Sequence, residues 1–137
     1  MVNTDVISTS SSILDSTKKT LGLSPDYDVF DPDIIMHINT VFSFLQQLGV
    51  GPTEGFMIED ASTTWDEFIS DTRLNSIKSY IFLRVKLLFD PPQTSFVLSA
   101  MKEQIQELEW RINVHREMYN DPTIIDSDII DGGSPSI

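Results

Sequence analysis

Hydrophobic side chains recur every three or four residues in three long segments of the chain, the spacing that places them on one face of an α-helix. In the first segment the positions are Ile34, Ile38, Val41, Leu45 and Leu48. In the second they are Leu74, Ile77, Ile81, Val85 and Leu88, and in the third Val97, Met101, Ile105, Leu108, Ile112, His115 and Tyr119. Each segment therefore predicts a helix whose apolar face packs into a core.

Start and stop signals give two of these helices their boundaries. Asp31 is expected to be the N-cap of the first, because a carboxylate accepts backbone N–H bonds and the proline after it loses no hydrogen bond in the first turn. Gly49 ends that helix. By the same reasoning Asp90 is expected to cap the last helix, with Pro91 and Pro92 tolerated in its first turn.

Two shorter helices are predicted from their caps. Ser12 can cap a helix over residues 13–21, which Gly22 ends in a left-handed conformation. Thr64 and Glu67 form a capping-box pattern, in which each side chain binds a backbone N–H at the start of a helix. A short helix therefore begins there, and the second long helix follows it to about Phe89.

The last helix is predicted to run about 26 residues and to end before Asp121, a length of ~40 Å at about 1.5 Å per residue. That is long for so small a domain. Its ends are therefore expected to overhang into a partner.

Residues 49–55 contain too much glycine and proline for regular structure and predict a surface loop. The loop leads into a short extended segment at Phe56, Met57 and Ile58. With 137 residues, of which 40% are hydrophobic, the chain is expected to form one domain. We predict an all-α fold, a small bundle of about four helices over residues 12–119, with a flexible N-terminus at 1–11 and an extended C-terminal tail at 120–137.

The net charge of −12 is distributed unevenly along the chain. Residues 1–70 carry eleven acidic and two basic side chains (net −9), residues 71–118 six and seven (net +1), and residues 119–137 four and none (net −4). Such a balance excludes a protein that grips nucleic acid through clustered Lys and Arg. The acidic half either repels or orients something, or it only keeps the protein soluble.

The chain has no cysteine, which excludes disulfides, thiolate metal sites and thiol nucleophiles. It begins without a basic leader, and no apolar run reaches the ~20 residues of a membrane span. We expect a soluble, unprocessed protein with no membrane partner.

Candidate catalytic and metal-binding residues are few. His37 and His115 lie on predicted helices, but each is preceded at three residues by an isoleucine, where a di-iron bundle requires glutamate. Glu103 and Glu107 lie one turn apart on what is expected to be a solvated face. We therefore predict no catalytic residue, no metal site, no cofactor and no enzyme.

Several motifs follow one another in a characteristic order. They are the run from Ser24 to Asn39, Leu48-Gly49-Val50-Gly51-Pro52, Trp65-Asp66-Glu67-Phe68, the helix that ends in Asp90-Pro91-Pro92, and Glu107-Leu108-Glu109-Trp110-Arg111. Their order resembles the head-tail connector (adaptor, or head completion) proteins of long-tailed double-stranded DNA bacteriophages. The resemblance covers about residues 12–118.

The resemblance implies a structural virion protein in the phage neck, assembled in the host cytoplasm. It implies a ring below the portal, usually of twelve copies, which forms part of the channel through which the genome passes and joins the portal to the tail. The implied partners are other copies of the chain, the portal protein and the next neck or tail-side protein (stopper or tail completion). The DNA would pass without specific binding.

Two contact regions follow from the same resemblance. The C-terminal segment of such adaptors can reach the portal, which suits a tail that carries Ile124, Ile125, Ile129 and Ile130 among its aspartates. By itself that tail is either a docking segment that orders on a partner or an idle terminus. The loop would contact a neighbouring subunit or the tail-side protein through Gly49, Val50, Gly51, Pro52, Phe56 and Ile58.

The main rival hypothesis is an acidic inhibitor that mimics DNA and binds a nuclease or a repressor. A mimic should project its carboxylates as a regular array over one face. Here many acids sit at expected caps and loops, such as Asp31, Asp66 and Asp90.

Overall fold

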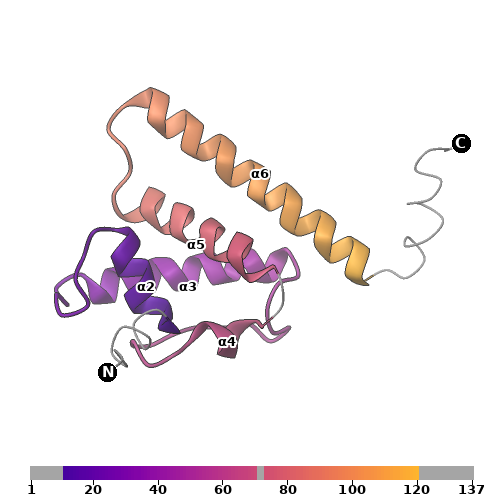
Figure 1. Ribbon diagram of the computed structural model, residues 1–137, viewed down its shortest axis with the longest axis horizontal. Helices are drawn as coiled ribbons and strands as arrows, with labels where there is room; N and C mark the ends of the chain where they lie inside the picture. Colours follow the sequence, from indigo (N-terminus) through magenta and orange to yellow (C-terminus); the bar gives the residue numbers. More distant parts are fainter. Residues whose placement is uncertain (1–10, 71–72, 121–137) are drawn as a thin grey trace, which may run out of the picture.

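The computed structural model describes residues 11–70 and 73–120, with side chains described as far as residue 114. The helices are α2 (Ile13–Thr20), α3 (Asp31–Gln47), α4 (Trp65–Phe68), α5 (Leu74–Phe89) and α6 (Ser95–Asn120) (Figure 1). The described residues form no strand, including the segment 56–58, and their one isolated β-bridge joins Ser12 to Thr64. The prediction of an all-α bundle with a long last helix is confirmed.

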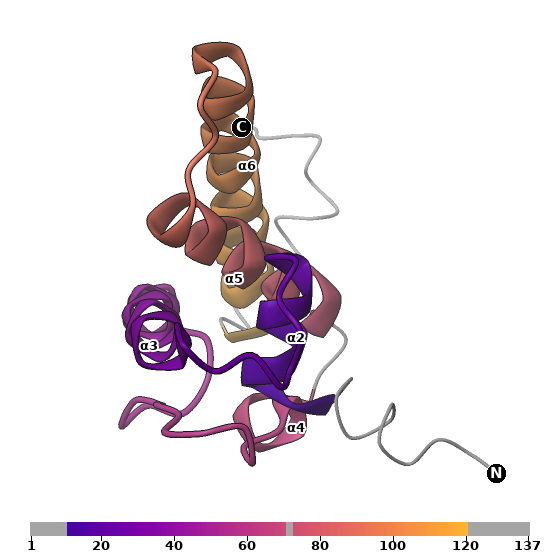
Figure 2. The same cartoon turned by 90° about the vertical axis from the view of Figure 1, so that its left-hand side faces the viewer.

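Helix α5 lies at the centre of the bundle. It packs against α3, α6 and α2, and α2 also packs against α3. Figure 2 shows α6 on one side of α5, and α3, α4 and the loop between them on the other. The molecule therefore has an α6 layer and a layer of α2, α3, α4 and their loops, with α5 between them.

The apolar stripes predicted for α3 and α5 form the core. Seven of their residues are fully buried: Ile34, Ile38, Val41, Leu45, Ile77, Ile81 and Val85. Burying a side chain of this size contributes roughly 2 kcal/mol each. Among the side chains of α6 that the structure describes, those of residues 95–114, only Ile105 and Ile112 are buried, so this part of α6 rests on the core along a narrow seam.

The short helices begin as their sequences predict. The Ser12 hydroxyl accepts a hydrogen bond from the backbone N–H of Asp15 at 3.2 Å, and Gly22 after α2 has a φ of +79°. At α4 the capping box is present, with the Thr64 N–H donating to Glu67 Oε2 at 3.1 Å. Both cap predictions are confirmed.

Two N-cap predictions are wrong. The N-cap of α3 is Phe30, and Asp31 is the first helical residue. Asp90 follows the last residue of α5, and α6 begins only at Ser95. The prolines explain the second error: a residue before proline is disfavoured in the α region, and this restricts both Asp90 and Pro91.

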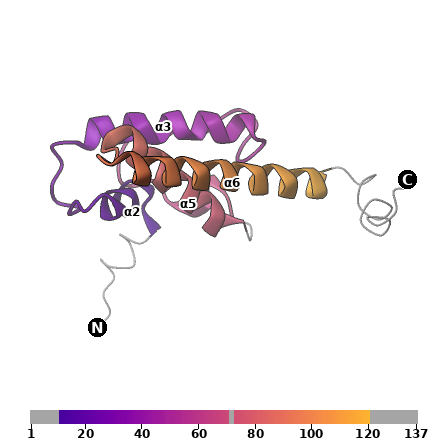
Figure 3. The same ribbon diagram turned by 90° about the horizontal axis from the view of Figure 1, so that it is seen from above.

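Helix α6 contains 26 residues, as predicted. At about 1.5 Å per residue it is ~39 Å long. Figure 3 shows its C-terminal part continuing beyond the ends of α3 and α5. The expected overhang is therefore present at that end.

Candidate functional site

The loop over residues 49–60 leaves α3 through a tight helix end. The Gly49 N–H donates to the Gln46 carbonyl at 3.0 Å, and the Val50 N–H donates to the Leu45 carbonyl at 2.9 Å. Gly49 has a φ of +80°, the left-handed conformation that this kind of helix end requires. Val50 then turns into the core, where it is buried.

Side chains of α3 hold the loop at two further points. Asn39 binds both backbone groups of Ile58, donating from Nδ2 to the carbonyl at 3.0 Å and accepting the N–H on Oδ1 at 2.8 Å. Gln46 Nε2 donates to the Thr53 carbonyl at 2.8 Å. Because both anchors come from the same helix, the segment between them keeps a fixed position beside α3.

An aromatic cluster lies beneath the loop. The Phe42, Phe56 and Phe68 rings have centroids 4.6 to 5.2 Å apart. Gly51, with a φ of +88°, passes so close to the cluster that an added Cβ would lie 2.5 Å from Phe68 Cε1. The position therefore requires glycine for two reasons, its backbone conformation and the contact with the ring.

The predicted contact residues of the loop divide by exposure. Val50 and Ile58 are buried and support the loop from within the chain. Gly51, Pro52 and Phe56 are half-buried, and Gly49 is exposed. The most exposed apolar residue of the loop is Met57, at 70%, which is not among the predicted contact residues. The only signal for it was its place between Phe56 and Ile58, since neighbours in an extended segment face opposite ways.

A groove of about 780 Å³ separates the tip of the loop from the outer face of α3. Its α3 wall runs from Pro32 to Gln46, and its loop wall comprises residues 54–57. Met36, 57% exposed, and Met57 supply its largest exposed apolar surfaces. Flexible methionine side chains adapt to varied partners, so this groove is a candidate docking surface.

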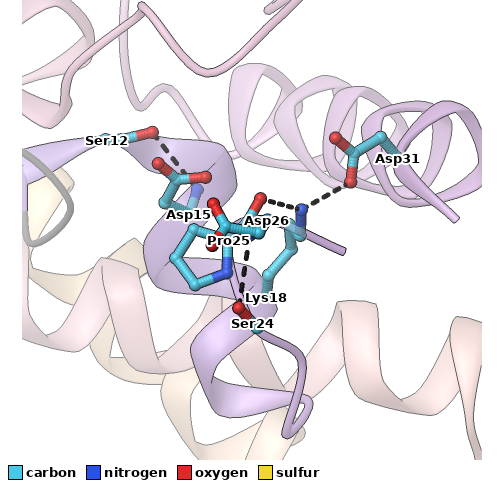
Figure 4. Close-up of polar contacts among 7 residues, drawn as sticks. All are labelled: Ser12, Asp15, Lys18, Ser24, Pro25, Asp26 and Asp31. Carbon is cyan, nitrogen blue, oxygen red and sulfur yellow. Dashed lines mark hydrogen bonds and ion pairs between the residues drawn. The ribbon is translucent and has the colours of Figure 1, made fainter. Parts of the chain in front are cut away.

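A second feature, a buried ion pair, joins α2 to the start of α3 (Figure 4). Lys18 Nζ lies 2.8 Å from Asp31 Oδ1 and donates to the Pro25 carbonyl at 3.0 Å. The Lys18 side chain is only 1% exposed, whereas that of Asp31 is 25% exposed. Burial raises the pKa of the nearby Asp15 carboxyl, and Lys18 acts in the opposite direction. Asp31 thus neutralises a buried cation instead of capping its own helix.

A third polar group joins α5 to α6. The Tyr80 hydroxyl donates to Glu109 Oε2 at 2.7 Å, and Arg84 Nη2 donates to the same oxygen at 2.6 Å. The Arg84 guanidinium also lies over the Phe44 ring of α3, 4.6 Å from its centroid. Burial and the bond to Glu109 raise the pKa of Tyr80 to about 12. This group fixes the narrow α5–α6 contact at one point.

The residues considered for chemistry are scattered. Within the described residues no group of three or more His, Asp or Glu side chains could hold a metal ion. Glu103 and Glu107 are both exposed, and Glu107 pairs with Arg111 at 2.7 Å. His37 packs its ring 6.4 Å from that of Phe89.

Several predictions fall on residues that lie outside the described part of the chain. They are the N-terminus at 1–10, the tail with Ile124, Ile125, Ile129 and Ile130, and the side chain of His115. No helix of the described ranges is both long and apolar enough to cross a membrane.

A protein-family model matches most of the chain. Residues 13–119 match the model of a family described as phage connector protein. No curated protein and no solved structure matches the chain.

Proposed function

The chain belongs to the phage connector protein family, and on that premise we propose that it forms a ring below the portal and joins the capsid to the tail. The observation that carries the proposal is the extent of the match, because residues 13–119 include every described helix except the last residue of α6. The family is structural and non-enzymatic, and its place is the neck of the virion. A ring of about twelve copies is part of the proposal.

The charge distribution supports a role beside passing DNA. Residues 11–70 carry ten acidic and two basic side chains, and one of these bases, Lys18, is buried against Asp31. The accessible charge of the α2–α4 layer is therefore almost entirely negative. In our proposal this layer faces the channel, where it repels phosphates so that the genome passes without binding.

The partners in this proposal are the portal protein, neighbouring copies and the next protein toward the tail. The tail isoleucines at positions 124, 125, 129 and 130 would bind the portal, since apolar residues among aspartates suit a segment that orders on a partner. The groove beside Met57 is the surface available to a second contact.

The rival hypothesis of a DNA mimic is less well supported. Asp31 and Asp33 lie in the first turn of α3, and Asp66 and Glu67 in that of α4, where acids stabilise the helix dipole. Asp60 accepts hydrogen bonds from Ser62 within its own turn. These five acids serve local structure, so they do not form part of a regular array of carboxylates over one face.

Co-sedimentation with purified portal rings tests the proposal. We expect the full chain to pellet with the rings, and deletion of residues 120–137 to abolish this. Because a deletion also shortens the chain, a full-length variant with the four tail isoleucines changed to serine should also fail. A matched variant with Asp121, Asp126, Asp128 and Asp131 changed to asparagine should still bind.

The possible results of these experiments separate the tail contact from the connector role. Binding that survives loss of the isoleucines rejects the tail contact and leaves the connector role standing. Failure of the full chain to bind any portal rejects the connector role. Binding to a nuclease or a repressor in place of a portal would support the mimic. A reconstruction of the neck with the α2–α4 layer facing outward would reject the proposed channel lining.

A further inference from the structure

The loop between α2 and α3 presents apolar side chains at one end of the bundle. Tyr27 is 46% exposed, Val29 is 62% exposed and Phe30 is 37% exposed. The centroid of the Phe30 ring lies 5.9 Å from that of Tyr27 and 5.3 Å from that of Phe89, the last residue of α5. We call the surface formed by Tyr27, Val29, Phe30 and Phe89 the end patch. Large apolar side chains that gather at a surface mark an interaction site, whereas single ones do not.

A buried cation holds the loop that carries the end patch. Lys18, whose side chain is 1% exposed, donates to the Pro25 carbonyl and pairs with Asp31, so it ties down both ends of the loop (Figure 4). Between these ends the Tyr27 N–H donates to the Ser24 carbonyl at 3.1 Å and closes a turn. These contacts restrict the loop to one shape.

The core does not explain why this loop is held so firmly. Every residue from Ser24 to Phe30 is exposed, so the loop buries little apolar surface. Burial of the Lys18 charge is unfavourable even with a partner, and ordering a loop costs conformational entropy. A surface that is ordered before its partner arrives loses less entropy on binding. A firmly held loop with exposed apolar side chains therefore suits a binding surface.

Three carboxylates flank the end patch in the chain. Asp26, Asp28 and Asp33 are exposed, and among the described residues no base forms an ion pair with any of them. Asp26 and Asp28 alternate with Tyr27 and Val29. A complementary partner therefore places Lys or Arg beside its own apolar contacts. The same carboxylates repel phosphates, which excludes nucleic acid as the partner.

The end patch lies at the opposite end of the molecule from the C-terminal part of α6 (Figures 1 and 3). In the proposed function, the tail that follows α6 binds the portal. A subunit that meets the portal at one end meets the next neck protein at the other. In that arrangement the end patch faces the tail side.

We infer that the end patch binds the next protein toward the tail, through a surface on which apolar side chains are flanked by Lys or Arg. The inference rests on the proposed connector function, for which it names the tail-side contact and its chemistry. A second copy of the chain is a poorer occupant. Four of the eight bases among the described side chains already form ion pairs within the chain.

Thiol labelling tests the contact, because the natural chain contains no cysteine. Val29→Cys places a thiol at the most exposed position of the end patch. Its rate of reaction with a maleimide is measured in the free chain, with portal rings, and with portal rings plus the tail-side protein. The rate should stay high in the first two states and fall about tenfold in the third, because a well-packed contact excludes solvent.

Gln47→Cys is the matched control for labelling. Gln47 is exposed and lies at the other end of α3 from the end patch, and α3 contains 17 residues. Its length of ~25 Å separates the two thiols. The labelling rate of Gln47→Cys should not change when the tail-side protein is added. An equal fall at both positions would overturn the inference, since it would mean general shielding.

Neutralising the three carboxylates tests the charge of the partner. The variant Asp26→Asn/Asp28→Asn/Asp33→Asn should bind the tail-side protein about tenfold more weakly than the unmodified chain does, when both are bound to portal rings. Unchanged binding would overturn the inference that the partner surface is basic.

The matched control for charge is Glu59→Gln/Asp66→Asn/Glu103→Gln. It removes the same number of charges at other exposed positions, and Asp66, like Asp33, lies in the first turn of a helix. It should bind the tail-side protein as the unmodified chain does. An equal loss of binding in the control would overturn the inference, because net charge and not the end patch would then be responsible.

Portal co-sedimentation of each variant reports separately on the connector function. Variants that pellet with the portal, while the tail-side protein leaves the Val29→Cys rate unchanged, overturn the end-patch contact and leave the connector function intact. Slow labelling already in the free chain or with the portal alone also overturns it. Another segment of the chain, a second copy or the portal would then cover the patch. If the unmodified chain does not pellet with the portal, the connector function and the inference fall together.

Discussion

Changing Asp31 to asparagine should destabilise the protein more than its position in the first turn of a helix suggests. The change keeps the shape of the side chain and removes its charge. Lys18 Nζ, 2.8 Å away on a side chain only 1% exposed, then loses its ion-pair partner and keeps its hydrogen bond to the Pro25 carbonyl, with Asp15 as a nearby acid. A buried charge without a counter-charge is strongly unfavourable.

The magnitude follows from the unequal exposure of the two partners. Removing one member of a buried pair costs about 3 kcal/mol when the charge that remains is buried. Loss of a carboxylate at the start of α3 adds about 0.5 kcal/mol. Lys18→Met instead leaves the carboxylate of Asp31, which is 25% exposed and reaches water. That variant should cost only about 1 kcal/mol, and the double variant should be close to it.

Urea unfolding at neutral pH, followed by helical circular dichroism, measures these changes. The slope of free energy against urea should stay the same while the midpoint falls. Asp33→Asn is the matched control, because Asp33 lies in the same first turn but is exposed, and it should cost about 0.5 kcal/mol. The reasoning is refuted if Asp31→Asn costs no more than this control, or if Lys18→Met is the more damaging of the pair.

Three further variants test other contacts. Gly51→Ala should cost more than about 2 kcal/mol, because Gly51 has a left-handed φ and the added Cβ would lie 2.5 Å from an aromatic ring. Gly22→Ala, with open space around it, should cost about 1 kcal/mol. Equal urea midpoints for the two variants would contradict the ring contact. The raised pKa of the Tyr80 hydroxyl contributes stability that is present below the ordinary tyrosine pKa of 10.0 and is lost as pH rises toward about 12. Tyr80→Phe should therefore reduce the loss of stability at alkaline pH, and an unchanged dependence of stability on pH would contradict this prediction. The pKa of Asp15 is raised in the fold, so Asp15→Asn should stabilise the protein at neutral pH. The gain in stability should disappear below pH 3.8, where the carboxyl is protonated in both states. A gain that persists below pH 3.8 would contradict this explanation.

Much of the fold was predictable because local rules agreed with the tertiary packing. The apolar spacing of α3 and α5 located the core, and the caps at Ser12 and Thr64 located two helix starts. The predictions that Asp31 and Asp90 are N-caps were wrong, because in each case another interaction or restriction decided where the helix begins. The carboxylate of Asp31 pairs with the buried Lys18, and Pro91 and Pro92 prevent α6 from beginning before Ser95.

The candidate site was harder to predict, since exposure depends on which elements cover one another. Glycine and proline correctly marked the loop, but they could not show that Val50 and Ile58 turn inward while Met57 turns outward. The groove beside α3 has no signature of its own in the sequence. It exists because Asn39 and Gln46 hold the loop that follows α3 beside the helix.

Helix α6 shows why a periodic pattern can locate a core and still miss an interface. The more regular stripe runs through Met101, Ile105 and Leu108, and the opposite face is predicted to be solvated because Glu103 and Glu107 lie on it. Yet an interface between copies needs some charge to stay soluble before assembly and some aromatic surface to bind afterwards. A face that mixes Phe96 and Trp110 with paired charges meets both needs. The periodic pattern alone therefore does not reveal that this face of α6 combines exposed aromatic and charged side chains.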